Sequence, residues 1–122
     1  MRAESRALAN VLLERHRTIC RPLGRRDFDD VDNNDIDVSI TSYGDLCEQA
    51  GLGREFARAA RNFLFEIAQW CDEHEWPPLN ALAVNAQTGY PGDGYSEAPG
   101  CQDWPNDVKR AIGFAAYPLR VE

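Results

Sequence analysis

The stretch REFARAARNFLFEIAQWCDEH, residues 54–74, decides the fold. Its apolar side chains recur every three or four residues, which is the spacing of a helix with one buried face. The side chains on that face are Phe56, Ala60, Phe63, Leu64, Ile67 and Cys71. We therefore expect one long helix here, at the centre of the core.

A shorter helix precedes the long one. Ser42 and Asp45 have the spacing of a capping box, in which a serine oxygen and a carboxylate bind free backbone N–H groups at a helix start. We expect this helix over residues 43–50. The glycine-containing turn at residues 51–53 then leads into the long helix.

The beginning of the chain is divided by charge. Residues 1–26 carry seven arginines and two glutamates, whereas residues 27–48 carry eight acids and no basic residue. Apolar residues at helical spacing predict a basic helix over residues 3–19, ended by Pro22 and Gly24. Two interpretations of the acidic block stay open: it neutralises the basic block within the fold, or it faces a partner.

The acidic block has the pattern of a loop followed by a strand. Ile36, Val38 and Ile40 alternate with polar residues, which is the period of a half-buried strand. On such a strand the carboxylates of Asp35 and Asp37 would point to solvent.

The second half of the chain predicts a strand, a loop and a helix. Residues 79–87, LNALAVNAQ, read as a mostly buried strand, and the Gly- and Pro-rich residues 88–94 read as a turn. Asp103 is placed to cap a final helix, and residues 115–122 are expected to add a short edge strand. The apolar face of the final helix would comprise Trp104, Val108, Ala111, Ile112 and Ala115.

This order of elements predicts a small single α+β domain spanning residues 1–122, with about four helices packed on a short, mostly antiparallel sheet. Its parts would be a basic helical segment (1–26), an acidic loop (27–35) and an α+β core (36–122). In the middle of the chain, the predicted order of a short helix, a turn, a long helix, a strand and a glycine-rich loop is also that of a winged helix.

Composition favours a cytoplasmic protein. The net charge is −7, there is no apolar signal or membrane-spanning stretch, and a polyanionic partner such as nucleic acid is disfavoured. The four widely spaced cysteines, Cys20, Cys47, Cys71 and Cys101, fit reduced thiols better than a disulfide scaffold.

Two metal sites can be tested against the sequence. If Asp30, Asp32 and Asn34 were the first, third and fifth ligands of a calcium loop, Asp35 would stand where glycine is needed and Thr41 where glutamate is needed, so the pattern fails. A looser, weak Mg²⁺ or Ca²⁺ site among the aspartates stays open as an alternative. Zinc has a weak candidate set in two pairs at helical spacing, His16 with Cys20 and Cys71 with His74. The alternative is that Cys71 is a core residue.

No motif indicates an enzyme or a cofactor. The cysteines and serines have no local nucleophile signature, and the glycine-rich GYPGDG segment lacks the lysine of a phosphate-binding loop. We expect no catalytic residue and no cofactor.

A helix-turn-helix order supports a nucleic-acid alternative. Residues TSYGDLCEQAGL (41–52), followed by RAARN (58–62), resemble the DNA-binding part of alkylguanine DNA alkyltransferases and alkyltransferase-like proteins. The resemblance implies a winged helix with Arg54, Arg58 and Arg61 facing nucleic acid. The reactive Pro-Cys-His-Arg segment of that family is replaced here by residues 77–80, PPLN, which excludes alkyl transfer.

The overall profile of the chain resembles bacterial toxin-immunity proteins, including those of contact-dependent growth inhibition, many of which are small acidic inhibitors of basic nucleases. The resemblance implies a protein–protein interaction with a basic toxin domain. Carboxylates would guide the association and aromatic side chains would anchor it. The candidate contact residues are Asp27, Asp29, Asp30, Asp32, Asp35, Asp37, Tyr90 and Tyr95, while Trp104 fits the core better than an interface.

Overall fold

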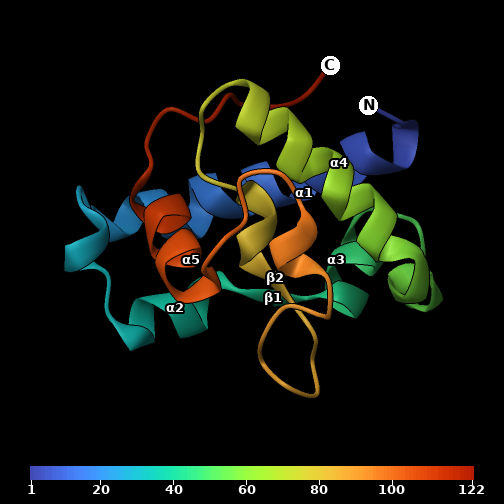
Figure 1. Ribbon diagram of the computed structural model, residues 1–122, viewed down its shortest axis with the longest axis horizontal. Helices are drawn as coiled ribbons and strands as arrows, with labels where there is room; N and C mark the ends of the chain where they lie inside the picture. The colour runs from blue at the N-terminus through green and yellow to red at the C-terminus, as the bar shows by residue number, and fades with distance from the viewer.

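The molecule contains five α-helices, and in Figure 1 the two longest lie in the upper part of the view with the three shorter ones mostly below them. The computed structural model describes all residues, 1–122. The helices are α1 (Ala3–Arg15), α2 (Asn33–Ser39), α3 (Tyr43–Gln49), α4 (Ala60–Glu73) and α5 (Trp104–Gly113). The strands β1 (Thr41–Ser42) and β2 (Ala83–Val84) form the only sheet.

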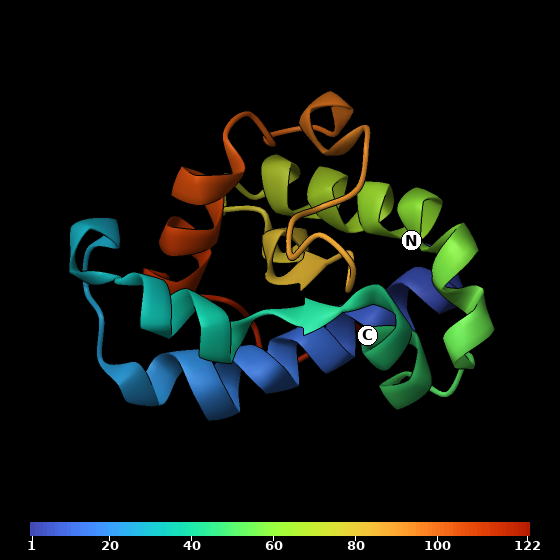
Figure 2. The same ribbon diagram turned by 90° about the horizontal axis from the view of Figure 1, so that it is seen from below.

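The core surrounds the short segment Leu79–Val84, every residue of which is buried. This segment contacts α1, α4 and α5, and Figure 2 shows it between α4 on one side and α1 on the other. The main cluster of buried apolar residues includes Leu8 and Leu12 from α1, and Ile67 and Cys71 from α4. The fold is thus a set of helices packed around a buried connecting segment.

The predicted α+β class is wrong. The single sheet has only two residues in each strand, and the strands are parallel, with Thr41 opposite Ala83 and Ser42 opposite Val84. Most of residues 79–87 do not form a strand either: Leu79–Leu82 is a 3₁₀ turn, and only Ala83 and Val84 pair with β1. A short apolar run has the same composition in a buried strand and in a buried turn, so its periodicity could not distinguish them.

The predicted winged-helix arrangement is also wrong, because the sheet has no hairpin that could form a wing. A wing is an antiparallel hairpin, but the partner of β2 is β1, which lies before α3 and runs parallel to β2. The loop after β2 returns to the rest of the molecule through a 3₁₀ turn at Tyr95–Glu97, without a second strand.

The predicted strand at residues 36–40 is helix α2. Asp32 is its N-cap: Asp32 Oδ1 accepts a hydrogen bond from the Asp35 N–H at 2.8 Å, and Asp35 Oδ2 accepts one from the Asp32 N–H at 3.2 Å. This reciprocal capping box stabilises a helix start more than the alternation of Ile36, Val38 and Ile40 favours a strand.

The other helices lie close to their predicted positions. The long helix predicted over residues 54–74 is α4 preceded by a 3₁₀ turn at Arg54–Ala59, and α1 continues through a π turn, His16–Cys20, before the chain turns at Gly24 with φ +70°. Ser42 caps α3 as expected, since its Oγ accepts from the Asp45 N–H at 3.1 Å, but the Asp45 carboxylate pairs with Arg54 and does not complete the predicted capping box. Asp103 is the N-cap residue of α5, but its side chain makes no capping bond.

The predicted edge strand at the end of the chain is absent. Residues 115–122 are irregular and run back along α1, where the Asn10 amide exchanges two hydrogen bonds with the Val121 backbone, at 2.7 and 3.2 Å. No helix has both the length and the apolar character needed to cross a bilayer.

Candidate functional site

Five of the six aspartates predicted to contact a partner lie on the surface. We call the set Asp27, Asp29, Asp30, Asp32 and Asp37 the acidic edge; all five side chains are exposed. They lie on the turn before α2 and on α2 itself. Figures 1 and 2 place this segment at one end of the molecule, opposite α3.

Asp35 differs from its five neighbours. Asp35 is only 3% exposed. Its carboxylate accepts two hydrogen bonds from the Arg25 guanidinium, at 2.8 Å from Nε and 3.3 Å from Nη2. These hydrogen bonds are the main cause of the lowered pKa of Asp35. Asp35 is therefore a structural residue, and the prediction that its carboxylate faces solvent is wrong.

The basic N-terminal block holds α2 at both ends. Arg25 binds Asp35 in the first turn of α2, and the Arg15 guanidinium donates to three carbonyls at the last turn of α2. The Arg15 distances are 2.8 Å to Ser39 O, 3.3 Å to Val38 O and 2.8 Å to Ile40 O. A cation at a helix C-terminus also interacts favourably with the helix dipole. The two blocks neutralise each other only at Asp35, and the acidic edge makes no ion pair.

Two large apolar side chains are exposed within the same segment. Phe28 is 42% exposed and Val38 is 45% exposed. Phe28 stands between Asp27 and Asp29, and Val38 follows Asp37. Each of these exposed apolar side chains is thus next in sequence to a residue of the acidic edge.

The predicted aromatic anchors have different environments. Tyr90 is 61% exposed, and its ring packs edge-on against Trp104 with the centroids 5.3 Å apart. Tyr95 is half-buried, and its hydroxyl donates to Asp107 Oδ2 at 2.9 Å. Trp104 is also half-buried, with its indole N–H donating to Ala81 O at 2.8 Å. Of the three, only Tyr90 is free to serve as an anchor.

The three arginines predicted to face nucleic acid, Arg54, Arg58 and Arg61, differ in whether they form ion pairs. Arg54 pairs with Asp45 and Glu48, at 2.5 and 3.0 Å, and Arg61 pairs with Glu97 at 3.0 Å. Arg58 is exposed and makes no ion pair. A phosphate contact would have to compete with carboxylates at two of the three positions. The nucleic-acid role of these arginines stays a prediction.

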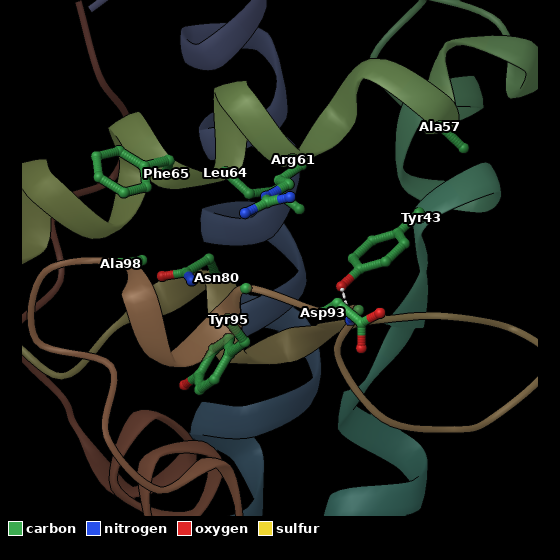
Figure 3. Close-up of a pocket in the computed structure, with 11 residues that line it drawn as sticks. Tyr43, Ala57, Arg61, Leu64, Phe65, Asn80, Asp93, Tyr95 and Ala98 are labelled. Carbon is green, nitrogen blue, oxygen red and sulfur yellow. Dashed lines mark hydrogen bonds between the residues drawn. The ribbon is translucent and has the colours of Figure 1, made fainter.

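A cavity of about 170 Å³ lies beside α4, between the start of α3 and the loop Gly92–Ala98 (Figure 3). Its wall is mostly apolar and aromatic, with a few polar groups. Tyr43 joins two sides of the wall, because its hydroxyl accepts a hydrogen bond from the Gly92 N–H at 2.7 Å. The residues that line it include Tyr43, Ala57, Arg61, Asn80, Asp93 and Tyr95.

Asn80 is the unusual member of this wall. It is 5% exposed, and its Nδ2 lies 3.6 Å from Cys101 Sγ, but its Oδ1 is the one buried side-chain oxygen or nitrogen without a hydrogen-bond partner. A buried acceptor without a donor costs about 1–3 kcal/mol. Buried polar groups without a partner are uncommon in folded proteins.

The weak zinc candidate set is divided between the core and the surface. His16 is buried and its Nε2 lies 2.8 Å from Ala111 O, whereas His74 is exposed and stacks on Trp76. No group of three or more His, Cys, Asp or Glu side chains has an arrangement that could hold a metal ion. The four residues therefore do not form a zinc site.

The four cysteines are all buried free thiols. Burial is the largest cause of the raised pKa of each thiol, and for Cys71 it raises the pKa to about 12. Because the thiolate is the reactive form, this environment disfavours a nucleophilic role.

Several residues of interest had no signal in the sequence. Nothing in the order of residues indicated that Asn80 would keep an unpaired oxygen or that Tyr43 would bind Gly92, because both are contacts between distant segments. Phe28 could have been noticed as an aromatic residue within an acidic run. No family model, curated protein or solved structure matches the chain.

Proposed function

We propose that this protein binds a basic protein surface through the acidic edge and inhibits that partner, most simply a nuclease toxin against which it provides immunity. The observation that carries the proposal is the state of the five aspartates. They are exposed and without counter-ions, on a segment that Arg15 and Arg25 hold in place. A fixed group of negative charges attracts the Lys and Arg side chains with which nucleases bind phosphate.

The neighbouring apolar side chains support the same role. Charge pairs guide association and fix orientation, while buried aromatic and aliphatic anchors supply most of the affinity. Phe28 and Val38 can supply such anchors beside the aspartates, and Tyr90 adds an exposed ring. Figure 1 shows the loop that carries Tyr90 and helix α2 projecting to the same side of the molecule.

The test of this proposal is an inhibition assay with a defined partner. An immunity protein is encoded next to its toxin, so the product of the adjacent reading frame is the protein to purify. We expect stoichiometric inhibition of its nuclease activity and a stable complex on gel filtration. An adjacent product that forms no complex and keeps full activity would contradict the proposal.

A double variant tests whether the apolar neighbours of the acidic edge are part of the contact. Replacing Phe28 and Val38 with serine should weaken the complex by about 2 kcal/mol or more if both side chains become buried in it. The matched control replaces Leu119 with serine, since Leu119 is 68% exposed and lies in the tail. Equal affinity of both variants would exclude Phe28 and Val38 as anchors.

A further inference from the structure

We propose that the loop Asn85–Gly92 enters the substrate cleft of the partner, so that inhibition is competitive with the partner's nucleic-acid substrate. This inference rests on the proposed function, because it concerns how the same partner is inhibited. Figure 1 shows the loop projecting from the molecule beyond β2. A projecting loop fits a concave surface, and enzymes bind their substrates in concave sites.

The loop holds its own conformation. Asn85 closes it, since its N–H donates to Tyr90 O and its carbonyl accepts from the Gly89 N–H, both at 2.8 Å. The Asn85 Oδ1 accepts from the Gln87 N–H, also at 2.8 Å. Thr88 Oγ1 lies 3.2 Å from both the backbone N and the backbone O of Tyr90. A loop that is ordered before binding loses less conformational entropy in the complex.

The base of the loop is fixed to the rest of the fold. The Gly92 N–H donates to the Tyr43 hydroxyl at 2.7 Å. The Tyr90 ring packs edge-on against Trp104, whose own indole N–H is bonded to Ala81 O. Tyr90 is nevertheless 61% exposed. A tyrosine held in this way offers a large contact area with little loss of conformational entropy on binding.

The loop carries no charge. None of the residues 85–92 is acidic or basic, although 27% of the chain is charged. The centre of a protein interface is depleted of charged residues, because burying an unpaired charge is unfavourable, whereas the rim is polar. The neutral loop is therefore suited to the centre of the complex, and the acidic edge to its rim.

One helix connects the loop with the acidic edge. Trp104, which supports Tyr90, is the first residue of α5, and Gly113 at the other end of α5 lies against the Asp27 carbonyl. The 10 residues of this helix span about 15 Å. A standard interface covers about 800 Å² on each partner. One partner can therefore contact the acidic edge and the loop together.

The position of the acidic edge places the loop at the cleft. A nuclease binds phosphate with Lys and Arg side chains where its substrate lies, so the basic surface that attracts the acidic edge borders the substrate cleft. The loop and α2 project to the same side of the molecule (Figure 1). When the aspartates meet the border of the cleft, the loop, about one helix length away, meets the cleft itself.

The experiment measures inhibition of the adjacent-gene product at several concentrations of its nucleic-acid substrate. We expect an apparent inhibition constant that rises linearly with substrate concentration. Tyr90→Ser should raise the inhibition constant by about tenfold or more, because it removes an anchor at the centre of the complex. Phe65→Ser is the control: it changes an exposed aromatic residue on α4 and should leave the constant within about twofold.

Two results would overturn this inference and leave the proposed function intact. They are an inhibition constant that does not depend on substrate concentration, and equal inhibition by Tyr90→Ser and the unmodified protein. The order of the loop is measured in the protein alone: the ¹⁵N order parameters of residues 86–90 should be about 0.85, as in a rigid backbone, and values below about 0.6 would contradict the inference. An adjacent-gene product that forms no complex contradicts the proposed function as well.

Discussion

Arg25 and Asp35 form a two-point ion pair across the turn that joins the basic N-terminal block to α2. The side chain of Asp35 is 4% exposed and that of Arg25 is 35% exposed, and the shorter of the two bonds joins Arg25 Nε to Asp35 Oδ2 at 2.8 Å. The same carboxylate closes the capping box of α2. One aspartate of the acidic run thus positions the helix that displays the others.

This pair makes the stability of the protein depend on pH in a defined direction. The pKa of Asp35 is lowered in the folded state, chiefly by Arg25, so its stabilising contribution is complete above the ordinary aspartate pKa of about 3.9 and is lost as the pH falls through the folded value. Arg25→Gln should lower the urea midpoint at pH 7, and the difference from the unmodified protein should shrink in acid. Arg26→Gln, an exposed neighbour, is the control. A difference that stays constant with pH would contradict this assignment.

Arg15 should stabilise the other end of α2. Arg15→Met keeps most of the side-chain bulk but leaves three carbonyls without their donor, and we expect a loss of about 1–3 kcal/mol in the free energy of unfolding. Hydrogen exchange should accelerate in the amides of α2 more than in those of α4. Arg6→Met, at an exposed position of α1, should change neither quantity. Uniform acceleration across the fold would argue against a local role of Arg15.

These contacts explain why residues 33–39 form helix α2 although the sequence pattern predicted a strand there. Ile36, Val38 and Ile40 have the alternation of a strand, but the structure buries Asp35 and Ser39, which are four residues apart, and leaves Val38 exposed. The prediction from this alternation took no account of the capping box between Asp32 and Asp35. The arginines that hold the helix at both ends were not visible in the sequence, because they bind from segments whose position depends on the rest of the fold.

The helices that were predicted well have stronger local signals. The apolar stripe of α4, from Ala60 to Cys71, is buried as expected, and the Ser42 cap of α3 is in place. The segment Leu79–Val84 was predicted as a strand because it is apolar, yet its surroundings of α1, α4 and α5 offer no sheet to join beyond two residues of β1. The acidic edge could be read from composition, whereas the cavity around Asn80 depends on contacts between distant residues.

Leu79 should be a large contributor to stability, because it is fully buried where the helices meet. Leu79→Ala removes most of a buried side chain and should reduce the free energy of unfolding by about 2–5 kcal/mol. Leu119→Ala makes the same chemical change at a position that is 68% exposed, and its effect should stay within about 0.5 kcal/mol. Chemical denaturation of both variants measures the difference, and similar midpoints would contradict the central position of Leu79.

His16 should weaken the fold as the pH falls. It is buried against Ala111 O and the ring of Tyr117, and burial is the main cause of its lowered pKa. The unfolded chain takes up a proton near the ordinary histidine pKa of about 6.5, so stability is complete above that pH and declines below it, by about 1.4 kcal/mol for each unit of pKa lowering.

The comparison that isolates this effect uses two substitutions. His16→Phe should flatten the decline in unfolding free energy between pH 7 and about 5, whereas His74→Phe, at an exposed position, should retain it. A decline of the same size in His16→Phe would assign it to other groups. If the His16→Phe side chain does not fit the core, His16→Gln offers an uncharged group of similar reach.

The acidic edge should control the rate at which the protein meets a basic partner. Replacing its five aspartates with asparagine changes the net charge from −7 to −2, and association with the adjacent-gene product should slow by about tenfold or more at low salt. The difference should shrink as salt screens the charges. The control replaces five exposed acids elsewhere with their amides and has the same net charge; these are Glu14, Glu55, Asp72, Glu73 and Glu122. Stopped-flow measurements at several salt concentrations compare the two variants. If both slow equally, the overall charge guides the association and the acidic edge is not the contact surface, whereas a selective effect in the first variant places the partner on α2 and the turn before it.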